Sequence, residues 1–194
     1  MSISKKKNVN AESGATSVAP DLVKAGFSQS FIDRFAGTEE VSERDYAGAA
    51  MTIATNALAM RAKSRGELAA QLKRRGIPLD VANDVLDRLE RSKLIDDLEF
   101  ARVWSRTRLS SKKISKRVLA QELRKKEVAE DLIAIALDEI STDDEYEAAL
   151  QLGERKARSL ANYALDVRER RITSALARKG YNYSIISRVL KEIA

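Results

Sequence analysis

Apolar residues recur in the same register three times along the chain, at spacings of 51 and then 53 residues. Seven positions define this register in the first copy, namely Leu68, Leu72, Gly76, Ile77, Val81, Leu86 and Leu89. The matching positions hold Leu119, Leu123, Glu127, Val128, Leu132, Leu137 and Ile140, and then Ile172, Leu176, Gly180, Tyr181, Ile185, Leu190 and Ile193. Periods of roughly 20 to 50 residues are typical of stacked supersecondary units. The pattern therefore predicts an array of helical units rather than one irregular domain.

Each copy is predicted to contain three helices. In the first copy, apolar and small residues follow helical spacing from Tyr46 to Leu58, which predicts the first helix. Ser64 followed by Glu67 is typical of a capping box that begins the second helix, and the third helix opens near Pro78. The same scheme opens the second and third copies, at Asp96 with Glu99 and at Thr142 with Glu145.

The predicted fold is all-α, an elongated array of three tandem three-helix repeats at residues 44–95, 96–141 and 142–194. No strand pattern is present in the sequence. Residues 1–43 scatter Ser, Gly, Asn and Thr among few apolar residues, so we expect a largely disordered N-terminal extension. Within it, the apolar residues from Leu22 to Phe35 predict one short helix that docks on the body.

Composition argues against catalysis. The chain has no cysteine and no histidine, which removes thiol nucleophiles, disulfides, imidazole bases and the usual zinc ligands. It has no phosphate-binding glycine loop, HExxH, GxSxG or dinucleotide fingerprint, so we expect no enzyme and no cofactor. Asp96, Asp97 and Glu99 invite a metal site, but carboxylates at a helix start accept hydrogen bonds from free backbone N–H groups instead. No metal is therefore expected.

The sequence also bears on location. No apolar run approaches the roughly 20 residues that a membrane-spanning helix needs, and residues 1–10 lack a following apolar signal core. We expect a cytoplasmic monomer that does not associate with membranes.

Charge is segregated along the chain. Residues 102–126 hold ten basic residues and one acid, residues 127–149 hold nine acids and no Lys or Arg, and the remaining tail holds ten cations and four acids. Such segregation indicates separate faces for a polyanion and for a partner or neighbouring repeat, with solvated helix faces as the competing interpretation. The ten central basic residues are Arg102, Arg106, Arg108, Lys112, Lys113, Lys116, Arg117, Arg124, Lys125 and Lys126.

A basic corner follows the second helix of each copy, at Lys73–Ile77, Arg124–Val128 and Ala177–Tyr181. Two cations recur at matching positions of these corners, namely Arg74, Lys125 and Arg178, and Arg75, Lys126 and Lys179. Cations in the last turn of a helix interact favourably with its dipole, which explains one cation per corner but not two or three. A row of basic corners suits a helical polyanion or an acidic protein groove.

Glu127 stands where the other two copies have glycine. Either Glu127 adopts a strained left-handed conformation, or the chain turns there in a right-handed one. Substituting Glu127→Gly is expected to leave the free energy of unfolding unchanged or to raise it slightly.

Four motifs together resemble one known family, the RecX regulators of the bacterial recombinase RecA. They are S-x-x-E-L with a basic helix end and glycine in Ser64–Gly76, V-L-D-R-L in Val85–Leu89, L-I-D-D-x-x-F-A in Leu94–Ala101, and Q-E-L-R-K-K in Gln121–Lys126. The resemblance covers residues 44–194. Lys93 and Glu127 depart from it, because glycine is usual at both positions.

The resemblance implies a non-enzymatic modulator of RecA. Such proteins lie in the helical groove of the RecA filament on single-stranded DNA and limit ATP hydrolysis, strand exchange and the coprotease action that triggers the SOS response. It implies roles in DNA repair and recombination. The ten central basic residues, with Arg74, Arg75, Arg178 and Lys179, are the expected contacts to RecA or DNA.

Three other functions compete with this one. A sequence-independent protein that binds single- or double-stranded DNA without RecA would show log affinity falling with log salt at a slope near −5 for about six phosphates. A helix-turn-helix repressor needs a recognition helix that reads bases, whereas the third helices here are mixed or acidic. A generic helical scaffold would not explain the basic rows.

Overall fold

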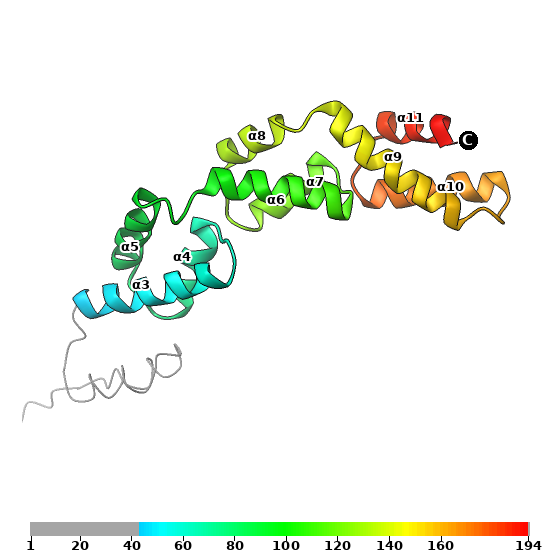
Figure 1. The fold of residues 1–194 in the computed structure, drawn as a ribbon. Coiled ribbons are helices and arrows are strands. Elements are labelled where there is room, and N and C mark those ends of the chain that lie inside the picture. Colours follow the sequence, from blue (N-terminus) through cyan, green and yellow to red (C-terminus); the bar gives the residue numbers. More distant parts are fainter. Residues whose placement is uncertain (1–42, 194) are drawn as a thin grey trace, which may run out of the picture.

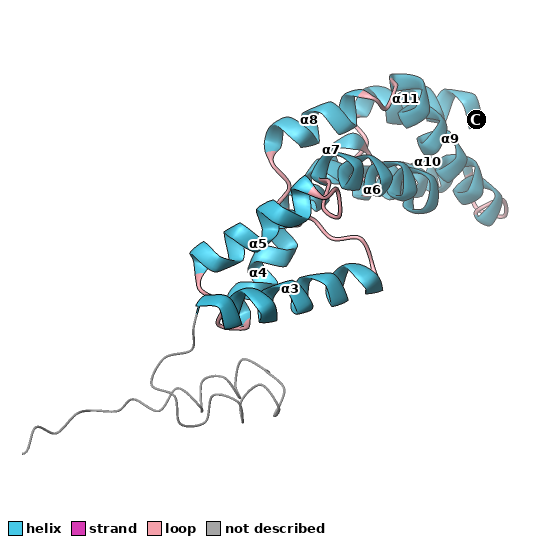
Figure 2. Ribbon diagram, turned by 60° about the vertical axis from the view of Figure 1, so that its left-hand side comes forward, coloured by secondary structure: helices cyan, strands magenta, loops and turns pink. Residues whose placement is uncertain are grey.

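The computed structural model describes residues 43–193 and shows an elongated, bent array of helices (Figure 1). Every regular element in this part of the chain is helical, as the colouring by secondary structure shows (Figure 2). The three-helix units follow one another in chain order, which confirms the predicted all-α repeat fold. The extension and its predicted helix from Leu22 to Phe35 lie outside the described residues.

Each repeat consists of three consecutive helices. Repeat 1 contains α3 (Glu43–Met60), α4 (Arg65–Arg74) and α5 (Leu79–Arg91). Repeat 2 contains α6 (Asp97–Lys112), α7 (Lys116–Arg124) and α8 (Glu130–Asp138), and repeat 3 contains α9 (Thr142–Ser159), α10 (Leu165–Arg178) and α11 (Tyr183–Ile193). The predicted register supplies the core, because Leu72, Leu123 and Leu176 are each fully buried in their own repeats.

Ser64 and Asp96 cap their helices as predicted, but the capping box predicted at Ser64 is incomplete, because the Glu67 carboxylate pairs with Arg61 and Lys126. The side chain of Ser64 accepts a hydrogen bond from the Glu67 N–H at 3.1 Å, and Asp96 accepts one from the N–H of its third following residue at 3.0 Å. The predicted start at Thr142 with Glu145 is wrong by one residue. Ser141 caps α9, because its hydroxyl accepts a hydrogen bond from the Asp144 N–H and the Asp144 carboxylate accepts one from the Ser141 N–H, which completes the capping box.

The three corners share one backbone conformation. The φ angle is +73° at Gly76, +58° at Glu127 and +90° at Gly180. Glu127 therefore adopts the left-handed conformation, and the right-handed alternative is wrong. Lys93, at the other position where glycine is usual, has a φ of +59°. Glu127 and Lys93 thus keep the left-handed turn without glycine. Each of them lowers the stability of the fold by roughly 1–2 kcal/mol relative to glycine.

Each corner of repeats 2 and 3 packs against the second helix of the preceding repeat, and we call this contact a joint. In the first joint the Ser64 hydroxyl donates a hydrogen bond to the Lys126 carbonyl. In the second joint the Ser115 N–H donates to the Lys179 carbonyl at 3.0 Å. Both serines cap their own helices and are at most 1% exposed. The sequence repeat is thus also a repeat of contacts between units.

A glycine stands on one side of each joint. A Cβ atom added to Gly66, in the first turn of α4, would overlap the Cβ and carbonyl of Glu127. In the second joint the glycine lies on the opposite side, because a Cβ atom on Gly180 would overlap the Ser115 hydroxyl and a Val118 methyl group. Glu127 stands where the other repeats have glycine, and its side chain needs space. The absence of a side chain on Gly66 leaves that space.

Substituting Gly66→Ala is expected to lower the free energy of unfolding by about 1–3 kcal/mol, because overpacking outweighs the gain of roughly 1 kcal/mol in helix propensity. In a Glu127→Gly background the loss should be smaller, because one overlapping atom is gone. Urea denaturation of both single variants and the double variant measures this coupling. Strictly additive losses would show that the two residues do not share the joint.

Candidate partner-binding surface

The two recurring corner cations have different environments. The first of each pair, Arg74, Lys125 or Arg178, is exposed and makes no ion pair within residues 43–193. The second of each pair is half-buried in every repeat, at Arg75, Lys126 and Lys179. We call the first set the outer corner cations. They present one charge per repeat along the length of the array, available to a binding partner.

Lys126 is a component of the first joint. Its ammonium lies 2.9 Å from the Glu67 carboxylate and 4.0 Å from the centroid of the Trp104 ring, and its side chain is only 14% exposed. The guanidinium of Arg108 lies 4.3 Å from the centroid of the same ring, and the indole N–H of Trp104 donates to Glu122 at 2.9 Å. Trp104 therefore makes contacts with two cations as well as packing against the repeat 2 core.

Acids within the array neutralise several other members of the central basic set. Arg102 and Arg106 both pair with Glu139, at 2.6 and 3.3 Å, and Arg124 forms two hydrogen bonds to Glu130. The hydrogen bond from Arg102 lowers the pKa of Glu139 below its ordinary value, and the one from Arg124 does the same for Glu130. The acidic stretch that follows the basic one therefore folds back on it in part. Fewer cations are free for a partner than the sequence alone indicates.

Three further central basic residues contact repeat 3, and only Arg117 among them contacts the corner at the second joint. The Lys113 ammonium donates to Gln151 at 2.5 Å, the Arg117 side chain donates to the Gly180 carbonyl at 3.3 Å, and the Lys116 N–H donates to Glu145 at 2.9 Å. Lys112 is exposed at the end of α6 with no ion pair in the described part of the chain. The structure thus divides the fourteen predicted site residues into joint residues, internally paired residues and a free minority.

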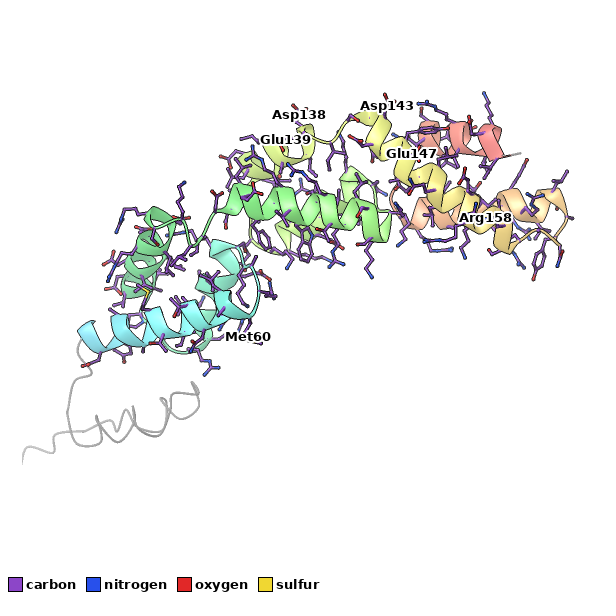
Figure 3. All side chains as sticks on the ribbon, viewed as in Figure 1. Met60, Asp138, Glu139, Asp143, Glu147 and Arg158 are labelled. Carbon is purple, nitrogen blue, oxygen red and sulfur yellow. The ribbon has the colours of Figure 1, made fainter. Side chains whose placement is uncertain are left out.

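Other charged surfaces were not among the predicted site residues. Repeat 3 carries exposed cations on α9 and α10, including Arg155 and Arg170, and the Arg171 guanidinium lies 4.2 Å from the centroid of the Tyr163 ring. The sequence feature that could have indicated these cations is the basic tail from residue 150 onward, in which four acids are interspersed among ten cations. Acidic side chains lie along the connection from α8 to α9, with Arg158 further along α9 (Figure 3). The labelled acids there are Asp138, Glu139, Asp143 and Glu147.

Within residues 43–193, no group of three or more His, Cys, Asp or Glu side chains is arranged to hold a metal ion. In the same range, no helix has the length and apolar character needed to cross a membrane. Tyr181 is 4% exposed and belongs to the repeat 3 core, as the register predicts, whereas Tyr183 is 84% exposed.

Comparison with known families accounts for all three repeats. The sequence matches the first, second and third three-helix domains of RecX at residues 50–89, 96–137 and 143–190. The chain belongs to the RecX family. Its family resemblance, first indicated by four short motifs, is therefore confirmed across the whole helical array.

Curated RecX proteins share much of the sequence. The chain is 37% identical to the regulatory protein RecX of Streptomyces coelicolor over 149 residues, which cover 77% of this chain and 79% of that protein. It is 41% identical to the regulatory protein RecX of Mycolicibacterium smegmatis, with 70% of this chain and 74% of that one covered. The RecX crystal structure from Lactobacillus salivarius is 23% identical and has the same fold, with a TM-score of 0.71 over 77% of this chain and 97% of that one.

Proposed function

We propose that this RecX protein is a non-enzymatic regulator, mainly an inhibitor, of RecA. In this proposal it lies in the groove of the RecA filament on single-stranded DNA and limits ATP hydrolysis, strand exchange and SOS coprotease activity. Membership of a family whose curated members are named regulatory proteins supports a regulatory role. The elongated shape of the array supports contact with several successive subunits of a filament (Figure 1).

The observation that carries the proposal is the row of outer corner cations. Arg74, Lys125 and Arg178 occupy the same register position in three consecutive repeats, and all three remain exposed, whereas the cation that follows each of them is half-buried. A partner with acidic groups repeated along its length can contact all three outer corner cations at once. Hydrogen bonds to charged groups contribute about 1.5–3 kcal/mol each, so three such contacts can make a large part of a binding energy.

The combined substitutions Arg74→Gln, Lys125→Gln and Arg178→Gln are therefore expected to weaken inhibition of RecA at least tenfold. The readout is the protein concentration that gives half-inhibition of ATP hydrolysis by RecA on single-stranded DNA. Glutamine keeps helix propensity while removing the charge, so the circular dichroism spectrum should not change.

A matched control removes the same charge elsewhere. Arg91→Gln, Arg155→Gln and Lys191→Gln replace three exposed cations that are not at the corners, and inhibition should change less than threefold. Equal weakening by both triple variants would mean that the corners have no special role. If the wild-type protein does not inhibit RecA at all, the alternative of sequence-independent DNA binding without RecA replaces this proposal, and a steep salt dependence of DNA affinity would support it.

A further inference from the structure

An apolar groove lies beside the first joint, between the end of α3 and the face of α6. Its volume is about 500 Å³, and its lining includes Leu58, Leu94, Phe100, Val103 and Trp104. Leu94 is 58% exposed and Val103 is 51% exposed, and both line the same groove. The groove is therefore an apolar surface without an occupant among residues 43–193.

Charged side chains border this apolar surface. The rim carries charges of both signs, including Arg61, Arg108 and Glu99. Contiguous exposed apolar surface with a polar rim is typical of an interaction site rather than of ordinary protein surface.

The sequence contains a segment whose chemistry matches the groove. Val23, Phe27, Phe31 and Phe35 are spaced four residues apart and would form one stripe of a helix. Three of the four phenylalanines of the chain are on this stripe, and the fourth, Phe100, lines the groove. Burying a phenylalanine side chain contributes about 1.5–3 kcal/mol, so the stripe has a strong tendency to find an apolar surface.

The groove is within reach of that segment. The chain enters the described fold at the N-terminal end of α3, and the groove lies at the other end of this helix of 18 residues, about 27 Å away. Residues 36–42 span up to about 25 Å when extended, and a helix over residues 22–35 adds about 21 Å. The segment can therefore lie back along α3 and place its phenylalanines on α6.

We propose that residues 22–35 bind as a helix in this groove, with the Val23, Phe27, Phe31 and Phe35 stripe against Val103 and Trp104. The occupant is part of the same chain, so its effective concentration is of millimolar order and a weak contact is sufficient. Binding there would cover the apolar surface next to the first joint.

Tryptophan fluorescence tests the proposal in the full-length chain, because Trp104 is the only tryptophan. Phe27→Asp combined with Phe31→Asp is expected to shift its emission to longer wavelength by several nanometres and to raise its quenching by acrylamide about twofold. Ala25→Asp combined with Gln29→Asp adds the same charges at the same spacing on the opposite helix face and should change neither quantity. Identical emission and quenching in all three proteins would overturn the proposal.

Chemical cross-linking gives a second test that identifies the occupant. The chain has no cysteine, so Ser28→Cys and Thr107→Cys introduce the only two thiols, one on the segment and one on the groove rim. A short bismaleimide should link them within one chain, with a yield independent of protein concentration. Links that form only between chains, with a yield that rises with concentration, would show that a second copy occupies the groove. Neither test involves RecA, so the outcome is separate from that of the proposed function.

Discussion

Substituting Gly180→Ala is expected to lower the free energy of unfolding by about 2–5 kcal/mol. The φ angle of +90° makes any L side chain unfavourable by roughly 1–2 kcal/mol, and the added Cβ overlaps the Ser115 hydroxyl and a Val118 methyl group. Overpacking of this kind costs about 1–3 kcal/mol more. Both neighbours are held in place, because Ser115 is 1% exposed and Val118 is β-branched on α7. Urea denaturation followed by circular dichroism measures the loss.

Gly76→Ala is the matched control. Gly76 has a similar φ of +73°, but it stands in the corner of repeat 1, where the described chain has no preceding repeat to form a joint. It should show the same backbone cost, about 1–2 kcal/mol, without the overlap that a joint adds at Gly180. Equal losses for Gly76→Ala and Gly180→Ala would contradict the view that the joint, and not the turn itself, requires glycine in repeat 3.

Acid is expected to weaken the first joint between pH 5 and pH 2. Burial by itself would raise the pKa of Glu67, but hydrogen bonds from Arg61 and Lys126 outweigh burial and lower this pKa to about 2. A carboxyl group whose pKa is lower in the folded state stabilises the fold above its unfolded pKa and loses this effect as the pH falls through the folded value. Glu67 is 19% exposed, and the shift corresponds to roughly 3 kcal/mol before screening by solvent reduces it.

Glu67→Gln separates this effect from that of the other carboxylates. The difference in free energy of unfolding between wild type and variant should be largest near pH 7 and should shrink towards zero near pH 2. Chemical denaturation at a series of pH values measures it. A difference that stays constant from pH 7 to pH 2 would mean that Glu67 is not ionised in the joint.

The register of apolar residues was sufficient to predict the fold. Positions such as Leu72, Leu123 and Leu176 lie in the interior of a repeat because local helical geometry decides which side chains face inward. Helix starts were nearly as predictable, since capping depends on residues three apart. The shift at α9 arose because Ser141 and Thr142 both suit a cap, and only the carboxylate of Asp144 selects between them.

The contacts at the joints could not be predicted from the local sequence pattern. Ser64 and Lys126 are 62 residues apart, and nothing in the local pattern shows that a capping hydroxyl also donates to the next repeat. For the same reason, the exposed and the half-buried cation of each corner could not be told apart from the sequence. Only the packing of Lys126 against Trp104 and Glu67 distinguishes a structural cation from the exposed Lys125 beside it.

Repeat 3 lacks the surface that would receive another corner. The register places Arg168 where repeats 1 and 2 have Ser64 and Ser115, and α10 begins earlier, at Leu165, so that helix covers the position. The Arg168 Nε is buried and has no hydrogen-bond partner in the described chain. The contact that joins each repeat to the next therefore has no counterpart on α10, and the two ends of the array present different surfaces.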